Sequence, residues 1–293
     1  MSDTDPEGVG PDEDFSTAGR RARFAEEARS ERPDLALLCL LVGAEAMPAP
    51  PPGCTDPYGL DAAQIELDRL AGLLPHGLTT PLDWATALAG VLGGRYGFCG
   101  ASPDYQRLES SLLQQVLRRR RGLPILLSVV WMEVARRAGA PVHGVALPGH
   151  FVVGFGDPSE HVLADPFAGG AVLTGEDAEL MVAGATGVPL RESLPAPARP
   201  QAIVLRILNN VRAWAATRPE RTDVALWAVE LSLLLPSHPA RLRYERAQLL
   251  VQRGDFLRGA SEMEEYADVI GGIEPAAAET IRRGARAARA RLN

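Results

Sequence analysis

Few features of this sequence could cross-link the chain or hold a metal through sulfur. Its 293 residues include three cysteines, Cys39, Cys54 and Cys99, which are widely spaced and form no CxxC pair. A scattered, odd-numbered set of this kind excludes a disulfide framework and a zinc knuckle as the organising feature. We therefore predict three reduced thiols.

Concentrated positive charge is also scarce. The formal net charge is −7, and the one dense basic run, Arg118 to Arg121, is isolated. Because binding to a phosphate backbone needs clustered basic side chains, we expect no nucleic-acid partner. We interpret the basic run as a solvated helix end, with a docking patch for a carboxylate or phosphate as the alternative.

Long apolar runs are missing too. A transmembrane helix needs about 20 consecutive apolar residues, whereas the aliphatic run Leu35 to Val42 is only eight residues long. The acidic start, Met1 to Phe15, lacks the positively charged region of a signal peptide. The sequence therefore predicts a protein without contact with a membrane, located in the cytoplasm.

Composition divides the chain into four parts. Residues 1–17 are acidic and nearly free of large apolar side chains, which predicts a disordered tail. Residues 18–194 have the apolar periodicity of a folded domain. Three prolines within residues 195–200 predict a linker, and residues 201–293 are predicted to be helical.

Up to Gly139 the folded part is predicted to consist of helices. Apolar residues recur at helical spacing, and Pro33 is expected to interrupt the first segment, with Asp34 capping the helix after it. The most apolar segment, Pro124 to Ala138, is predicted to be the buried helix of the domain. The other predicted helices are Phe24 to Ala46, one beginning at Leu60, Pro81 to Leu92, and one capped by Ser110 and Ser111.

After Gly139 the sequence pattern changes from helical periodicity to short apolar runs rich in β-branched residues. These runs are typical of strands, and Asp157-Pro158-Ser159 predicts a hairpin connection. We expect a small antiparallel sheet packed on the buried helix, which makes the fold class α+β. The predicted strands are Val142 to Leu147, Phe151 to Phe155 and Val162 to Ala164.

Beyond the linker, small and large residues alternate as in tetratricopeptide repeats. One repeat unit is clear, and the remaining helices are predicted to pair as hairpins. The residues that carry the repeat pattern are Arg243, Ala247, Leu250, Gly254, Asp255, Phe256, Ala260 and Tyr266.

Four blocks of sequence carry the most specific signal. They are Arg121-Gly122-Leu123-Pro124-Ile125, Glu133 to Gly139, Pro148-Gly149-His150-Phe151, and Asp165-Pro166-Phe167-Ala168-Gly169-Gly170. Together they resemble the SirB1 family of the transglutaminase-like superfamily. The resemblance implies a transglutaminase-like, papain-like core over residues 18–194, followed by a helical region similar to tetratricopeptide repeats.

The resemblance also implies what the core would do in active members. There a cysteine at the start of a buried helix is activated by a histidine on a neighbouring strand, which an aspartate orients. His150 and Asp165 match the histidine and the aspartate. The cysteine position falls near Pro124 or Ile125, and neither residue is a nucleophile.

Two other residues are candidate nucleophiles. Ser128 lies about one turn beyond Pro124, although a helix serine usually bonds to a carbonyl of the preceding turn. Cys99 precedes His150 and Asp165 in the correct chain order, but it lies in a predicted loop, Gly93 to Asp104. The candidate catalytic residues are therefore His150, Asp165 and Ser128, with Cys99 as the less favoured nucleophile.

The same histidine and aspartate have a purely structural interpretation, as a satisfied polar cluster of the core. A metal site joining them to His143 and His161 is disfavoured, because these histidines have no short ligand spacing. We expect neither a metal nor another cofactor.

The sequence supports two hypotheses of function. In the first, the chain is a non-catalytic binding, scaffold or regulatory protein, whose partner is a protein or peptide bound at the His150 cleft and the C-terminal helices. In the second, it is a hydrolase or acyltransferase that uses Ser128 or Cys99 with His150 as general base and Asp165 as orienting group. Both hypotheses leave the oligomeric state open.

Overall fold

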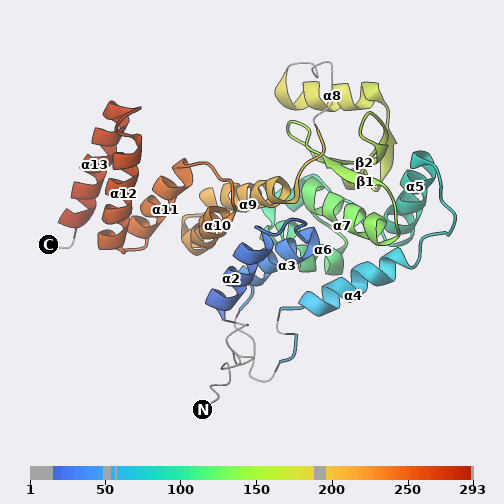
Figure 1. Ribbon diagram of the computed structural model, residues 1–293, viewed down its shortest axis with the longest axis horizontal. Coiled ribbons are helices and arrows are strands. Elements are labelled where there is room, and N and C mark those ends of the chain that lie inside the picture. Colours follow the sequence, from blue (N-terminus) through green and yellow to red (C-terminus); the bar gives the residue numbers. More distant parts are fainter. Residues whose placement is uncertain (1–15, 49–53, 57, 188–195, 292–293) are drawn as a thin grey trace, which may run out of the picture.

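The computed structural model describes residues 16–48, 54–56, 58–187 and 196–291 (Figure 1). The predicted disordered tail therefore lies outside the described residues, except for Ser16 and Thr17, and so does the first residue of the predicted linker. Ser16 caps the first helix, α2 (Thr17–Glu27), by accepting a hydrogen bond from the backbone of Gly19.

The first half of the chain is helical, as predicted. Helix α3 (Leu35–Glu45) follows the break at Pro33, and the Asp34 side chain accepts a hydrogen bond from Leu37 N, which confirms Asp34 as its cap. The next elements are α4 (Leu60–Ala71), α5 (Pro81–Leu88), a π-helix (Ala89–Arg95), two 3₁₀ turns (Ser102–Gln106 and Leu108–Ser111) and α6 (Leu113–Arg119).

Two local predictions in this half were wrong. Helical structure continues to Arg95, past the predicted start of a loop at Gly93, because the chain widens into a π-helix. Ser110 and Ser111 do not cap a helix. They lie in a 3₁₀ turn, and Leu112 takes the capping position of α6 without a side-chain hydrogen bond.

Helix α7 (Pro124–Arg137) is the centre of the molecule, and all its residues from Pro124 to Ala135 are buried. Proline at its first position suits a helix start, where the missing amide proton costs no hydrogen bond. Glu133, which is 3% exposed, is paired with Arg136 at 2.6 Å. The prediction that the segment Pro124 to Ala138 forms the buried helix of the domain is thus confirmed.

A four-stranded antiparallel sheet packs on α7 in the order β1-β2-β3-β4. The predicted hairpin is confirmed, because β2 ends at Asp157 and β3 begins at Glu160. The last strand and the helix after it, α8, were not predicted from the sequence. The bounds are β1 (Val142–Val145), β2 (Val152–Asp157), β3 (Glu160–Asp165), β4 (Ala171–Leu173) and α8 (Gly175–Thr186).

Helix α8 covers the face of the sheet opposite α7 (Figure 1). Side chains alternate between the two faces, as the pleat of a strand requires. Val152 packs with Ala178 and Val182 of α8, whereas Val153 and Phe155 join the main core. The sheet is therefore a thin middle layer between two helices.

The rest of the chain is helical, as predicted. Pro200, placed in the predicted linker, is the first residue of α9, and α9 and α10 share one continuous hydrophobic core with α2, α3 and α7. A second, smaller cluster joins α11, α12 and α13. The bounds are α9 (Pro200–Ala216), α10 (Thr222–Leu234), α11 (Arg241–Gln252), α12 (Phe256–Ile270) and α13 (Pro275–Ala290).

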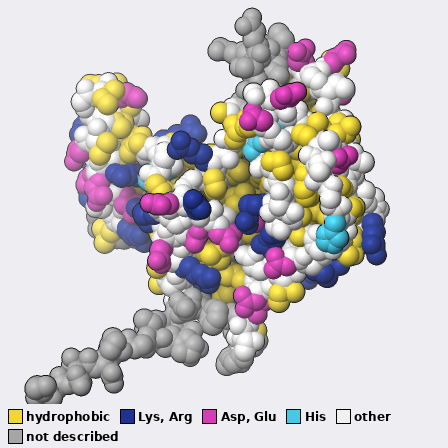
Figure 2. All heavy atoms as spheres, turned by 45° about the vertical axis from the view of Figure 1, so that its right-hand side comes forward, with side chains coloured by type: hydrophobic (Ala, Val, Ile, Leu, Met, Phe, Trp, Pro, Cys, Tyr) yellow, Lys and Arg dark blue, Asp and Glu magenta, His cyan; other side chains and the backbone are white. Residues whose placement is uncertain are grey.

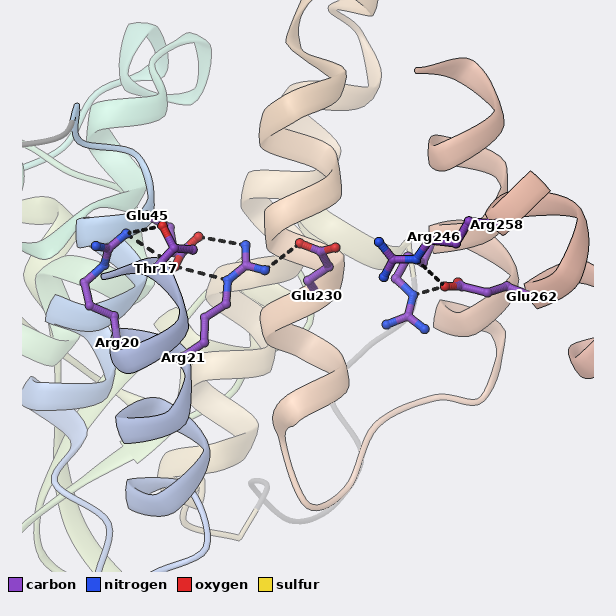
Figure 3. Close-up of polar contacts among 8 residues, drawn as sticks. All are labelled: Thr17, Arg20, Arg21, Glu45, Glu230, Arg246, Arg258 and Glu262. Atoms are coloured by element: carbon purple, nitrogen blue, oxygen red, sulfur yellow. Dashed lines mark hydrogen bonds and ion pairs between the residues drawn. The ribbon is translucent and has the colours of Figure 1, made fainter. Parts of the chain in front are cut away.

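Ion pairs join segments that are distant in sequence (Figure 3). Arg21 of α2 lies between Glu45 of α3, at 2.9 Å, and Glu230 of α10, at 2.8 Å. Within the C-terminal helices, Glu262 of α12 accepts hydrogen bonds from Arg246 and Arg258. The Arg21 contacts therefore connect α2, the first helix of the described residues, to the helices after the predicted linker.

The surface mixes charges of both signs. Acidic and basic side chains are interspersed on the face drawn in Figure 2, with apolar side chains between them. Among the described helices, none combines the length and the apolar character that a membrane crossing requires.

Replacing Arg21 by methionine tests the connection between the first helix and α10. The Glu45 side chain is 4% exposed, so removal of Arg21 leaves a buried carboxylate with a weaker partner, Arg20 at 3.8 Å. We expect a loss of about 1–3 kcal/mol in the free energy of unfolding, measured by urea denaturation. Arg23→Met, an exposed position of the same helix, is the control. Equal stability of the two variants would contradict the structural role of Arg21.

Candidate functional site

His150 and Asp165 form a hydrogen-bonded pair, as the sequence suggested. His150 follows β1 through the turn Pro148-Gly149, where Gly149 has a φ of 73° that favours glycine. Asp165 is the last residue of β3, and its Oδ1 lies 3.0 Å from His150 Nε2. The side chains are 13% and 7% exposed, so the pair is largely shielded from water.

A second hydrogen bond fixes the aspartate. Its Oδ1 also accepts a hydrogen bond from the backbone of Phe167 at 2.9 Å, and its carbonyl oxygen accepts one from Gly170 N. Gly169 and Gly170 have φ values of 70° and 89°, a left-handed conformation that favours glycine. The turn holds the carboxylate toward the imidazole.

Aromatic rings cover the pair on one side. The Phe167 ring meets the His150 ring edge to face, with centroids 5.9 Å apart, and the Tyr105 ring meets Phe167 at 6.1 Å. Burial and the nearby carboxylate of Asp165 raise the pKa of Tyr105. Neither aromatic residue was identified from the sequence as part of the site.

Arg206 of α9 supports the histidine from a distant part of the chain. Its Nη2 donates hydrogen bonds to the carbonyl oxygens of Leu147, at 2.9 Å, and His150, at 2.7 Å. Its guanidinium carbon lies 5.6 Å from the centre of the Phe151 ring. Burial lowers the pKa of Arg206. The segment before His150 is therefore held by a helix that begins about 50 residues later.

Sequence reasoning missed Arg206 as a site residue. The available signal was an arginine on an otherwise apolar helix face, next to Ile203, Val204 and Ile207, all of which are buried. A charged side chain in such surroundings needs hydrogen-bond acceptors nearby.

No nucleophilic side chain lies at the start of α7, where Pro124 and Ile125 are both buried. Ser128, one turn further, is completely buried, and its hydroxyl donates to the carbonyl oxygen of Phe151 at 3.1 Å. The expected acceptor was a carbonyl of the preceding helical turn. The structure instead joins Ser128 to the segment next to His150, through the backbone and not through the imidazole.

The three cysteines, Cys39, Cys54 and Cys99, are free and form no disulfide with one another. Cys39 is buried in α3, and burial raises its pKa well above the ordinary value. Cys99 pairs through its backbone with Arg121, and its sulfur accepts a hydrogen bond from Arg121 Nη1 at 3.5 Å. Among the described residues, neither Cys99 nor Ser128 forms a hydrogen bond with the His150 ring.

His143 and His161 interact with each other instead of with His150. Nε2 of His143 on β1 lies 3.1 Å from Nδ1 of His161 on β3, across Gly154 of the middle strand. A side chain at position 154 would collide with His143, because a Cβ there would lie 2.6 Å from its Nε2. Over the part of the chain that the structure describes, no three His, Cys, Asp or Glu side chains are grouped to hold a metal.

Sequence comparisons agree with this architecture. The profile of the transglutaminase-like superfamily matches residues 61–209, and a tetratricopeptide repeat profile matches residues 211–293. The fold and the His150–Asp165 pair thus define a transglutaminase-like core joined to repeat helices.

Several relatives carry the name UPF0162. One from Xylella fastidiosa strain 9a5c is 34% identical over 193 residues, which cover 62% of this chain and 68% of the relative. Another, from Pseudomonas aeruginosa, is 31% identical over 185 residues, with 62% of this chain and 65% of the relative covered. The chain belongs to the UPF0162 proteins, also called the SirB1 family, of the transglutaminase-like superfamily.

Two other similarities are more distant. F-box only protein 21 of Mus musculus is 25% identical over 161 residues, which cover 52% of this chain and 25% of that protein. A crystal structure of menin has a TM-score of 0.41 at 15% identity, covering 92% of this chain and 69% of menin.

Replacing Ser128 by alanine tests whether its hydroxyl is structural. Because the change leaves the buried carbonyl of Phe151 without this donor, we expect a loss of about 1–2 kcal/mol in the free energy of unfolding. Ser261→Ala, at an exposed helix position, should change stability little. Unfolding in urea gives both values. An unchanged stability for Ser128→Ala would argue against the Phe151 hydrogen bond.

The histidine pair predicts a dependence of stability on pH. Burial lowers the pKa of both rings below the ordinary 6.5, and His161 lowers that of His143 further, while Asp157 opposes this. As pH falls below about 6.5, the unfolded chain binds more protons than the folded chain, so the free energy of unfolding decreases. The double variant His143→Gln, His161→Gln should show a smaller decrease than wild type between about pH 7 and 5.

The control for this titration is His76→Gln, which changes an exposed histidine of the α4–α5 connection. Its pH profile should match that of wild type. Identical profiles for wild type and the double variant would show that the pair does not titrate in this way.

Proposed function

We propose that this protein is a non-catalytic binding protein, in which the His150–Asp165 site and the C-terminal helices contact a protein or peptide partner. The observation that supports the proposal is the start of α7, where Pro124 and Ile125 are buried. The family resemblance implies a nucleophile near these two positions. In the thiol mechanism that the family resemblance implies, the histidine and the aspartate activate a cysteine and are not themselves the attacking groups.

The geometry of the alternative nucleophiles supports the same interpretation. The Ser128 hydroxyl has no solvent exposure and donates its proton to a carbonyl oxygen, so it lacks the imidazole contact that would activate it. The Cys99 sulfur accepts a hydrogen bond from Arg121, whose guanidinium also binds Asp104 at 2.9 Å. The side chain that packs on the His150 ring is thus that of Phe167, an aromatic residue that cannot act as a nucleophile.

A recognition role suits what surrounds the pair. The imidazole bonds to Asp165 and packs against Phe167, and Phe167 in turn contacts Tyr105. Arg206 donates a hydrogen bond to the backbone carbonyl of His150. Rigid aromatic and hydrogen-bonding groups of this kind dominate the energy of protein interfaces. The C-terminal helices add exposed apolar side chains for contact, Leu257, Val269 and Ile273, which are 61%, 60% and 84% exposed.

Activity-based labelling tests the proposal. We expect a serine-reactive fluorophosphonate and a thiol-reactive acyloxymethyl ketone to label wild type and His150→Ala equally, because no nucleophile depends on the imidazole. His76→Ala is the matched control for the loss of a histidine. Labelling that disappears in His150→Ala, and also in Ser128→Ala or Cys99→Ala, would establish the hydrolase or acyltransferase alternative and refute the binding-only function.

A further inference from the structure

A pocket of about 230 Å³ lies beside the His150 site, between the two 3₁₀ turns and α9. Tyr105 belongs to both places, because it lines the pocket and also packs on Phe167. The polar and aromatic lining includes Tyr105, Arg107, Ser111, Asn210, Trp214 and Arg218, with Gln106 and Thr217 beside them.

The pocket is positively charged in an acidic protein. Two arginines and no carboxylate line it, although the net charge of the chain is −7. Asp104, in the same 3₁₀ turn as Tyr105, is buried and paired with Arg121 at 2.9 Å and Arg119 at 3.7 Å. Glu109 is exposed and is not part of the lining. The local field therefore favours an anion.

One wall of the pocket is rigid before any ligand binds. Trp214 Nε1 donates to the carbonyl oxygen of Gln106 at 3.0 Å, and Arg218 Nη2 donates to the Gln106 side chain at 3.1 Å. The guanidinium of Arg218 lies 4.4 Å from the centre of the Trp214 ring. These contacts hold the aromatic and cationic groups in place, which lowers the entropy cost of binding.

The other wall offers unused hydrogen-bonding capacity. Ser111 is 3% exposed, yet its hydroxyl forms no hydrogen bond within the described part of the chain. Arg107 is exposed and, among residues 16–48, 54–56, 58–187 and 196–291, has no ion-pair partner. A carboxylate would accept hydrogen bonds from both groups.

We infer that this pocket binds the carboxylate of an acidic residue in a partner peptide. The inference rests on the proposed binding function and specifies the chemistry of the partner. The volume accommodates one side chain, Tyr105 and Trp214 provide aromatic surfaces, and Tyr105 connects the pocket to the His150 site, so that a peptide chain extends from one to the other. Aromatic and arginine side chains are the groups most enriched where peptides and proteins bind.

Fluorescence anisotropy tests the inference with the full chain. The probe is a fluorescein-labelled, C-terminally amidated peptide of alternating glutamate and glycine, and the matched peptide has glutamine at every glutamate. We expect the glutamate peptide to bind at least about tenfold more tightly than the glutamine peptide. Arg107→Gln should weaken binding about threefold, since its side chain is exposed, and Arg218→Gln should weaken it more.

Arg23→Gln is the control, because it removes an equal charge from an exposed position of α2 that is not part of the pocket. It should leave the affinity unchanged. Since Arg218 also holds Gln106, Arg107→Gln decides the outcome if Arg218→Gln lowers the melting temperature.

Three results would overturn the inference: equal binding of both peptides, no detectable binding of either, or the same affinity in Arg107→Gln and Arg23→Gln. Free succinate and unlabelled peptide are also compared as competitors. If succinate displaces the probe at as low a concentration as the unlabelled peptide does, the pocket binds a small carboxylate and the inferred peptide partner is refuted. The titration involves no covalent step. A negative binding result would therefore refute only the inferred peptide partner. Labelling that depends on His150 would refute the proposed function itself.

Discussion

The burial of α7 on all sides is the constraint on which the rest of the structure depends. The sheet packs on this helix, and α3, α4, α6 and α9 contact it from other directions. A helix in such surroundings tolerates polar groups only when each has a partner. Ser128 bonds to Phe151, and Glu133 pairs with Arg136 and Arg137. The Nε1 of Trp131 is an exception, buried without a hydrogen bond in the described structure. The same burial closes the start of the helix, where active relatives of this fold class would need a reactive side chain.

The His150 site is built by elements that are far apart in sequence. Asp165 orients the imidazole from β3, and a 3₁₀ turn, Pro166–Ala168, places Phe167 against it. Arg206 of α9 binds the carbonyl oxygens of Leu147 and His150. The two profile matches meet within α9, between residues 209 and 211. In the structure, however, α9 and α10 share the core of the transglutaminase-like part. Helix α11 contributes Leu242 and Leu249 to that core and Ala247 to the separate cluster with α12 and α13. Arg206 therefore joins α9 directly to the segment that carries the histidine.

Sequence patterns predicted most elements but fewer contacts of the site. The α+β class, the buried helix, the Asp34 cap, the hairpin at Asp157 and the helical tail are confirmed, because each depends on local periodicity or turn chemistry. Helix α8 was missed, although the capping box between Thr174 and Asp177 in its first turn is a local signal for a helix start. Arg206 and Tyr105 could not be placed, since only the tertiary fold brings residues 105, 150, 165 and 206 together. The π-helix at Ala89–Arg95 likewise has no simple local signal.

The proposed recognition function rests on the surroundings of the His150–Asp165 pair, because among the described residues neither Ser128 nor Cys99 forms a hydrogen bond with the His150 ring. The hydrogen bond within the pair fixes a ring beside Phe167 and Tyr105, and Tyr105 leads to the arginine-lined pocket on α9. The most direct test of this account is pre-steady-state release of nitrophenol, observed by rapid mixing of wild type with an excess of p-nitrophenyl acetate. The account predicts no burst of nitrophenol, and a time course that superimposes on that of His150→Ala. A burst in wild type that is absent from His150→Ala would reveal an acyl-enzyme and contradict it.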